Sequence, residues 1–276
     1  MKITDKNNCK ILFFTDIHQN YDAVKKIPFD KYDICVCGGD IFDPTNPNLE
    51  VAKKIAEIIP KETLIVPGNC DKGKEIASII DSFQNIHKKR AKFLDINFFG
   101  IGFSRSLKED LIFYRDWFLD ETERITTFLK ESPSPFILNA CGIKSLEGGR
   151  VETIPMEEAI KNQSALISKF DFFLEEEIRG VFGDSDENDF NIILTHSPPR
   201  GMLDKLPGLP NIGSVSIAEA IKKIRPKIAL CGHFHENVGT LFKDGVVVFN
   251  PGAVKDNLYG EIEINEGSIK TNIIRV

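Results

Sequence analysis

Short apolar runs recur along this chain, and each one stops at a glycine or at a polar residue. They occupy residues 10–15, 32–37, 63–66, 191–195 and 227–231. Runs of this length, rich in Ile, Val and Phe and bounded by turn residues, are typical of buried β-strands. The pattern therefore predicts a sheet built from short, largely buried strands.

Helical periodicity separates the early strands. Residues 49–59 and 72–83 place apolar side chains at three- and four-residue intervals, which predicts amphipathic helices. Strands that alternate with helices indicate βαβ units and a mainly parallel sheet. From residue 238 onwards the pattern instead predicts a meander of hairpins. Its expected strands are residues 239–242, 246–250, 260–264 and 269–276. The expected fold is an α/β sandwich with its helices outside.

The pattern changes between residues 104 and 188. Residues 110–130 carry the only tryptophan, Trp117, in a helical pattern, and residues 155–181 form a second long candidate helix. We interpret 104–188 as a mainly helical insertion within a single domain that spans residues 1–276. Because the insertion begins near the edge where the strands end, it is placed to act as a lid or specificity cap. Its helix-spaced aromatic residues fit a packed core better than a base-stacking surface.

Composition and charge narrow the functional classes. The net charge of −6 disfavours nucleic acid as the main partner, because proteins that grip a long polyanion usually show a basic excess. The one basic cluster, residues 88–90, fits the solvated end of a helix. No apolar stretch reaches the roughly 18 residues of a membrane span, and residues 1–10 lack an apolar signal core. We therefore expect a cytoplasmic protein without membrane association, and its oligomeric state stays open.

The cysteines fit a reducing compartment. The chain has six cysteines, which is sparse for a disulfide framework in a protein of this length. Cys35 and Cys37 fall within a predicted strand, and no second cysteine pair at zinc spacing accompanies them. We interpret both as small buried side chains.

Metal-binding side chains follow the predicted strands. They are Asp16 and His18, Asp40 and Asp43, Asn69, His196, and His233 and His235. Ligands bind at the carboxyl ends of the strands in an open α/β sheet, so we expect these side chains at one edge. Each alone fits an ordinary turn or a structural histidine. As a set, they would be costly to collect unless cations joined them. Mixed nitrogen and oxygen donors suit divalent Mn, Fe, Zn or Ni. His87 stands apart and is expected to cap an element or face solvent.

These residues occur in ordered blocks that resemble the calcineurin-like metallophosphoesterase family. The blocks are Asp16-Ile17-His18, Gly39-Asp40-Ile41-Phe42-Asp43, Gly68-Asn69-Cys70-Asp71, Thr195-His196 and Gly232-His233-Phe234-His235, and Asn250-Pro251-Gly252 is similar to a later turn element. The blocks run from residue 16 to residue 252 and leave the insertion uncovered. The resemblance implies a four-layer α/β/β/α sandwich of two mixed sheets with flanking helices.

The resemblance also implies a role for each residue. One metal would take Asp16, His18 and His235, and the other would take Asn69, His196 and His233, with Asp40 bridging them. Asp43 lies outside the ligand set and either stabilises its loop or supports a ligand. Two cations about 3.5–4 Å apart can hold a hydroxide as nucleophile and clamp the attacking and departing oxygens. The expected cofactors are two divalent ions, with Mn first and Fe, Zn, Ni or Co as alternatives.

Further candidates surround this ligand set. The catalytic set is Asp40, Asn69, Cys70 and Asp71, and Asn69 and Arg200 are candidate substrate-binding residues. Many relatives have a leaving-group histidine at the position of Cys70, and the Gly-Asn-Cys-Asp form resembles a prokaryotic phosphodiesterase branch. Cys70 is either on the proton path or structural. Arg200 either binds a substrate phosphate or faces solvent.

The leading functional hypothesis is a metal-dependent phosphodiesterase or phosphomonoesterase that acts on a small or medium-sized phosphate ester. Pro44 and Thr45 replace the Arg-Gly pair that the protein Ser/Thr phosphatases carry, which argues against that branch. A nuclease is disfavoured by the acidic balance. A non-catalytic scaffold on the same fold need not keep the ligand residues, and here all of them are present.

Overall fold

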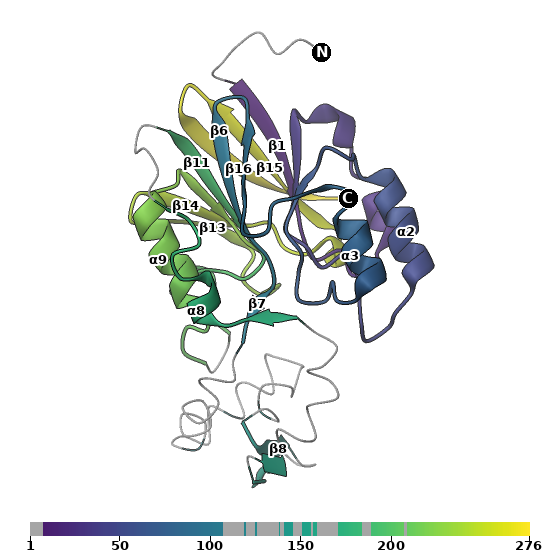
Figure 1. Ribbon diagram of the computed structural model, residues 1–276, viewed down its shortest axis with the longest axis vertical. Helices are drawn as coiled ribbons and strands as arrows, with labels where there is room; N and C mark the ends of the chain where they lie inside the picture. Colours follow the sequence, from purple (N-terminus) through teal and green to yellow (C-terminus); the bar gives the residue numbers. More distant parts are fainter. Residues whose placement is uncertain are drawn as a thin grey trace.

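Two sheets face each other in this protein, and helices cover their outer faces (Figure 1). The computed structural model describes residues 8–106, 119, 125, 138, 141–145, 151–155, 157–158, 171–183, 189–206 and 209–276. Each of the two large sheets has six strands and mixes parallel with antiparallel pairs. The expected α/β sandwich of two mixed sheets with flanking helices is confirmed.

The first sheet has the order β16-β15-β1-β2-β3-β4. Its strands are β1 (Asn8–Phe14), β2 (Ile34–Cys37), β3 (Leu64–Ile65), β4 (Gln84–Asn85), β15 (Leu258–Asn265) and β16 (Ser268–Arg275). Strands β1 to β4 run parallel, whereas β15 and β16 are antiparallel to their neighbours. The carboxyl ends of β1, β2 and β3 therefore share one edge.

The second sheet has the order β13-β14-β12-β11-β6-β5. Its strands are β5 (Arg90–Phe93), β6 (Ile96–Ile101), β11 (Phe190–Thr195), β12 (Ile228–Leu230), β13 (Gly239–Lys243) and β14 (Val246–Asn250). The four central strands run parallel and the two edge strands antiparallel. The carboxyl ends of β6, β11 and β12 thus also lie together.

The helices form the two outer layers. Against the first sheet lie α1 (Tyr21–Val24), α2 (Leu49–Ile58) and α3 (Lys74–Ile80), and against the second lie α8 (Glu175–Ile178) and α9 (Val215–Ile224). The chain also has the 3₁₀ turns η1 (Phe29–Lys31) and η4 (Val254–Asp256). The side chain of Asn48 caps α2 by accepting from Val51 N at 3.2 Å, which satisfies an otherwise orphaned amide. The two helices expected between the early strands are confirmed.

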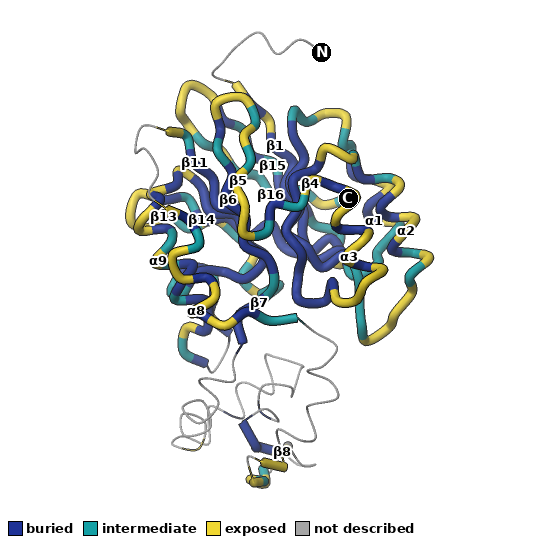
Figure 2. The backbone as a smooth tube through the Cα atoms, viewed as in Figure 1, coloured by how far each residue is buried: buried dark blue, intermediate teal, exposed yellow. Residues whose placement is uncertain are grey.

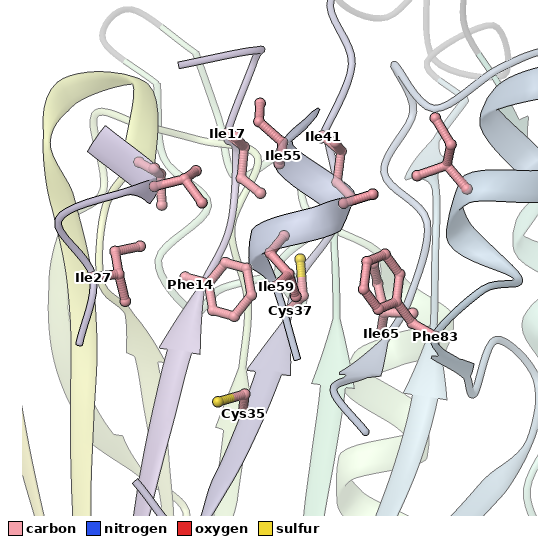
Figure 3. Close-up of a cluster of buried hydrophobic side chains, with 14 of the residues drawn as sticks. Phe14, Ile17, Ile27, Cys35, Cys37, Ile41, Ile55, Ile59, Ile65 and Phe83 are labelled. Atoms are coloured by element: carbon pink, nitrogen blue, oxygen red, sulfur yellow. The ribbon is translucent and has the colours of Figure 1, made fainter. Parts of the chain in front are cut away.

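The alternation of side chains along β1 divides the core into layers. Ile11 and Phe13 face the second sheet, whereas Leu12 and Phe14 face the helices, and all four are fully buried. Figure 3 shows Ile55 of α2 over the helix-facing side of the strands. Figure 2 shows the resulting buried layers between the exposed helices. Burying such side chains contributes about 1.5–3 kcal/mol each.

Cys35 and Cys37 are both buried on β2 and face the helices (Figure 3). All six cysteines of the chain are free and buried. The expectation that this pair is structural rather than a zinc site agrees with its packing.

Two strands of the predicted insertion, one at its start and one near residue 173, pair with each other. The short strands β7 (Ser104–Arg105) and β10 (Phe172–Phe173) pair in parallel. Within the insertion, β8 (Ile143–Ser145) and β9 (Val151–Thr153) form an antiparallel hairpin, and Figure 1 places β8 beyond β7, away from the large sheets.

The long helix expected over 155–181 is wrong at its carboxyl end. Phe172 and Phe173 have apolar spacing that fits a helix, but they pair with β7 instead, and only Glu175–Ile178 is helical after them. The candidate helix 110–130 lies outside the described residues apart from positions 119 and 125.

Two smaller expectations are corrected by the sheet topology. Residues 88–89 lead into β5 and Arg90 begins it, so this basic cluster is not at the end of a helix. The strands after residue 238 form the expected hairpins, β13 with β14 and β15 with β16, but the first hairpin joins the second sheet and the other joins the first sheet. Among the described helices, none has the length and apolar character needed to cross a bilayer.

Candidate metal centre

The expected ligand residues follow strands whose carboxyl ends share an edge. Asp16 follows β1, Asp40 follows β2 and Asn69 follows β3, whereas His196 and His233 follow β11 and β12 of the other sheet. Hydrogen bonds from backbone amides join the loops within and between sheets. His18 N donates to Asp40 O at 2.9 Å, and the N–H of His233 donates to Asp16 Oδ2 at 3.0 Å. The sandwich therefore places loops from both sheets around one centre.

Asp16, His18 and His235 form the first group of donor atoms. Their ligand atoms lie within 4.8 Å of one another, and His235 Nε2 is 3.1 Å from Asp16 Oδ1. Thr15 Oγ1 donates to the other carboxylate oxygen, Oδ2, at 2.8 Å. Among the described residues, Asp16 Oδ1 and His18 Nε2 are buried without a hydrogen-bond partner. These two atoms lie 3.9 Å apart, and an ion between them would satisfy both.

Asp40, His196 and Asn69 form the second group. His196 Nε2 lies 3.0 Å from Asn69 Oδ1 and 3.4 Å from Asp40 Oδ2. The carbonyl of Gly38 can only accept a hydrogen bond, so the contact at 2.8 Å makes His196 Nδ1 the donor. Nε2 then faces two oxygen acceptors, which would repel its lone pair. A proton or a metal ion between these three atoms removes their repulsion.

The buried ionisable groups of the site have pKa values that are shifted in opposite directions. Burial lowers the pKa of His196, but Asp40 outweighs burial and raises it to about 9. Burial and the neighbouring His196 instead lower the pKa of His233 to about 3, so His233 stays neutral and keeps a lone pair for a metal. Burial tends to raise the pKa of Asp16, yet His235 and the other imidazoles hold it below its ordinary value. Without a metal, His196 therefore holds a proton at neutral pH whereas His233 is neutral, and a divalent ion would displace the His196 proton to reach its Nε2 lone pair.

The backbone is strained at the expected ligands. Asp16, His18, Asp40 and His233 have positive φ angles of 56°, 43°, 55° and 67°. Non-glycine residues in this region are uncommon, and they cluster at functional sites where the surrounding structure holds them.

Glycines allow two carboxylates to approach the backbone. A Cβ on Gly68 would lie 2.0 Å from Asp40 Oδ1, and one on Gly232 would lie 2.4 Å from Asp16 Oδ2. Neither distance is possible for real atoms. These glycines directly precede two expected ligands, Asn69 and His233. A larger residue before either ligand would clash with a carboxylate, which explains the Gly-Asn and Gly-His pairs.

Asp71 accepts hydrogen bonds from backbone amides of two ligand loops. Its carboxylate receives Asp40 N at 2.8 Å, Gly68 N at 2.9 Å and Phe42 N at 3.1 Å. Burial and the Asp40 carboxylate raise the pKa of Asp71 to about 7, against the amide donors that lower it. The geometry makes Asp71 a positioning residue for the Asp40 loop. Nothing in these contacts gives it the direct catalytic role that the sequence suggests.

Cys70 lies inside the centre. Its sulfur is within 4.8 Å of ligand atoms of His18 and Asp40, and its backbone N–H donates to Asp40 Oδ1 at 2.7 Å. Burial, followed by Asp40, raises the pKa of the Cys70 thiol. The thiol is placed beside the expected bridging carboxylate, which leaves both of its sequence interpretations open.

Two other candidates lie outside the donor groups. Asp43 Oδ1 accepts from Thr45 N at 2.8 Å and from Thr45 Oγ1 at 2.6 Å, so it stabilises its own loop. Arg200 is half-buried, its backbone N–H donates to Ser214 O at 2.9 Å, and its side chain has no hydrogen bond or ion pair with the described residues. The structure does not bring Arg200 into the donor groups.

His87, expected to cap an element or to face solvent, does neither. Its Nδ1 accepts from Gly102 N at 2.8 Å and its ring packs on Phe103. The residue is half-buried and stands outside the donor groups.

Several supporting residues escape sequence reasoning. Thr15 orients Asp16, and its position as a polar residue at the end of an apolar strand is the one available signal. The carbonyl of Gly38 sets the tautomer of His196, and no side-chain pattern can reveal it. Asn250 Nδ2 donates to Phe234 O at 3.0 Å and Asn250 Oδ1 accepts from Gly252 N at 2.9 Å. The Asn-Pro-Gly turn thus supports the loop that carries His233 and His235.

Curated relatives match only part of this chain. An uncharacterized protein of Methanocaldococcus jannaschii, MJ1162, is 40% identical over 95 residues, which are 34% of this chain and 43% of that protein. The UPF0046 protein K07C11.7 of Caenorhabditis elegans is 33% identical over 63 residues, 23% of this chain and 21% of that protein. The chain thus spans less than half the length of these relatives.

Solved structures share the fold over nearly the whole chain. The crystal structure of TT1561 from Thermus thermophilus has a TM-score of 0.53 at 16% identity, and covers 97% of this chain and 99% of that one. A dimetal phosphatase from Danio rerio has a TM-score of 0.50 at 10% identity, with 97% and 98% covered. The family model of the calcineurin-like phosphoesterases matches residues 9–237, which include every candidate ligand. This chain belongs to the calcineurin-like phosphoesterase family.

Proposed function

We propose that this protein is a two-metal phosphoesterase that hydrolyses a small phosphate ester. The observation that carries the proposal is the pair of buried, unpartnered atoms Asp16 Oδ1 and His18 Nε2, beside Asp40 and His196. Family membership supports the same conclusion. Donors of this kind fit divalent cations, because carboxylate, imidazole and amide atoms converge with few hydrogen bonds of their own.

The donor groups suggest which residues would hold each ion. In our assignment, Asp16, His18 and His235 hold one cation, and Asn69, His196 and His233 hold the other. Asp40 is shared, since its Oδ2 lies 3.7 Å from His18 Nε2 and 3.4 Å from His196 Nε2. When bound, such a pair of cations would activate a water as nucleophile and stabilise the charge on the phosphoryl group. We favour Mn²⁺, with Fe, Zn, Ni and Co as alternatives.

Other residues of this chain would hold the metal ligands in position. Asp71 holds the Asp40 loop through backbone amides, and Gly38 holds the His196 ring with its Nε2 towards the site. The Asn69 side-chain amide has a donor to offer a phosphoryl oxygen. Arg200 has a guanidinium that no described residue engages, and we propose it as a phosphate-binding group supplied from the loop after β11.

The segment 104–188 is proposed as an insertion in one domain, acting as a cap on the metal edge. It leaves the core after β6, which is parallel to β11 and therefore ends at the same edge as His196. We also propose a cytoplasmic location, supported by six cysteines that are all buried and free.

Hydrolysis of paired aryl substrates tests the proposal. The protein, stripped with a chelator and reloaded with each metal in turn, is assayed on 4-nitrophenyl phosphate and on bis(4-nitrophenyl) phosphate. We expect metal-dependent release of nitrophenolate from at least one of them, and the ratio of the two rates decides between monoester and diester preference. Binding of two Mn²⁺ ions without hydrolysis of either compound would favour the non-catalytic scaffold.

A further inference from the structure

The returning end of the insertion contacts a ligand loop directly. The backbone N–H of Asp171 donates to the carbonyl of Asn69 at 2.8 Å. The side chain of Asp171 forms an ion pair with Lys72 at 3.1 Å, three residues beyond Asn69. Asp171 is therefore tied both to the Gly-Asn-Cys-Asp loop, at Asn69, and to Lys72, the residue that follows this loop.

The segment that carries Asp171 is anchored in the core. Asp171 immediately precedes β10, which pairs with β7. Arg105 Nε donates to Glu175 Oε1 at 2.8 Å, and both side chains are buried. The same Glu175 carboxylate accepts from Ser214 Oγ at 2.9 Å and from Ser216 N at 2.8 Å, at the start of α9. These contacts anchor the segment around Asp171 to the core. The Asp171 amide can therefore hold Asn69 in place.

The insertion also contacts the loop that carries His233 and His235 through apolar packing. Its side chains join with the loop before α9 in a buried group that we call the cap cluster. Its members are Ile125, Leu138, Cys141, Ile143, Leu206, Leu209 and Ile212. Phe234 packs against this cluster from between His233 and His235. The ring of Phe234 lies 4.7 Å from the ring of His233, and its carbonyl accepts from Asn250.

Both contacts meet residues of the same proposed metal site. Asn69 is held by Asp171, and His233 is braced by Phe234, whereas His196 is held by the core through Gly38. We propose that the insertion is a positioning element for the second metal, acting through the Asp171 amide and the Phe234 ring. This inference rests on the proposed function for the assignment of Asn69 and His233 to one cation.

If the insertion no longer holds these residues, the two metal ions should lose affinity unequally. Without Phe234 or the Asp171 amide, His233 or Asn69 must be ordered by the metal itself, which weakens binding. Asp16, His18 and His235 hold the first cation without a direct contact from Asp171. We expect the second ion to bind at least about tenfold more weakly and the first to change by less than about threefold.

Manganese titration of the full chain tests this, with the electron paramagnetic resonance of free and exchange-coupled Mn²⁺ as readout. The variants are Phe234→Ala, the conservative Phe234→Leu and Asp171→Pro, which lacks the amide hydrogen. Controls are Asp171→Ala, which keeps that hydrogen, and Phe242→Ala, whose side chain is 72% exposed on β13. We expect the coupled signal to weaken in Phe234→Ala and Asp171→Pro, to recover in Phe234→Leu, and to match wild type in both controls.

The outcomes separate this inference from the proposed function. Second-ion affinities within about twofold of wild type in folded Phe234→Ala and Asp171→Pro would overturn the positioning role. Two Mn²⁺ ions bound by a wild-type protein without hydrolytic activity would overturn the enzyme proposal alone, and the titrations would still decide the inference. A wild-type protein that binds no Mn²⁺ would overturn both.

Discussion

The backbone N–H of His233 donates to Asp16 Oδ2 at 3.0 Å, across 217 positions of the sequence. Thr15 Oγ1 donates to the same oxygen, so one oxygen of the Asp16 carboxylate is occupied by the protein. The other, Oδ1, faces His235 and has no hydrogen bond with the described residues. One side chain thereby joins the two sheets and offers a ligand atom to the centre.

Asp40→Asn is expected to abolish metal-dependent turnover in a folded protein. The amide oxygen of asparagine can still accept from Cys70 N, which now donates to Asp40 Oδ1 at 2.7 Å. The shared negative charge is lost, so two cations would no longer be held together. We expect a fall in kcat of at least about 100-fold and the loss of one bound ion or more. Metal analysis and steady-state kinetics measure both, and near-normal turnover with two ions bound would refute the bridging role.

Gly232→Ala is expected to damage the centre through a steric clash. The new methyl group would lie 2.4 Å from Asp16 Oδ2 and 2.4 Å from Thr15 Oγ1. Overpacking of this kind costs about 1–3 kcal/mol of stability, and the displaced carboxylate should bind metal more weakly. Gly183→Ala is the matched control, since its Cβ would meet only an Arg90 side-chain nitrogen at 3.5 Å. Urea unfolding and metal titration compare the two variants, and equal behaviour would contradict the clash.

Because position 70 is a cysteine, we expect the enzyme to hydrolyse esters with good leaving groups faster than esters with poor ones. Burial and Asp40 raise the pKa of the thiol, and a weakly acidic thiol donates a proton less readily than an imidazolium. General-acid help is worth about 10²–10⁴-fold. Wild type should therefore prefer aryl esters to alkyl esters, with a steep dependence of rate on leaving-group pKa.

The variant Cys70→His tests this role. If the larger ring is accommodated, the rate on poor leaving groups should rise by about tenfold or more and the dependence should flatten. Cys70→Ala is the control and should keep the wild-type slope. Parallel slopes in wild type and Cys70→His would show that the side chain at position 70 is outside the proton path.

His87 should make stability depend on pH away from the metal centre. Burial, with help from Lys88 and Lys89, lowers the pKa of His87 from 6.5 to about 4. The unfolded chain therefore binds more protons between these values, and stability falls as pH drops from about 6.5 to about 4. A depression of this size corresponds to at most about 3 kcal/mol.

His87→Gln provides the comparison, because its amide oxygen can still accept from Gly102 N while the residue no longer titrates. Chemical unfolding at several pH values should show a steeper loss of stability for wild type across this window. Two curves that run parallel from pH 7 to pH 4 would mean that His87 is not protonated on unfolding.

The sequence by itself was sufficient to predict the individual strands and helices and the polar residues at their ends. The apolar run of β1 ends one residue before Thr15 and Asp16, and the periodicity of α2 is visible in its spacing. These features depend on neighbours within a few positions, because burial repeats with the period of the element. The ordered blocks then indicated the family, since each block is a strand and the turn that follows it.

The tertiary structure alone decided the partners of these elements. The apolar run of β14 and the alternation of β15 both indicate strands, yet β14 pairs with β12 and β15 pairs with β1 in the opposite sheet. Phe172 and Phe173 fit a helix locally but pair with β7, and Asp171 consequently reaches Asn69. Backbone hydrogen bonds between distant segments leave no periodic signal in side chains, because every residue offers the same N–H and C=O groups. The same reason hides Gly38, whose carbonyl orients His196 across 158 positions.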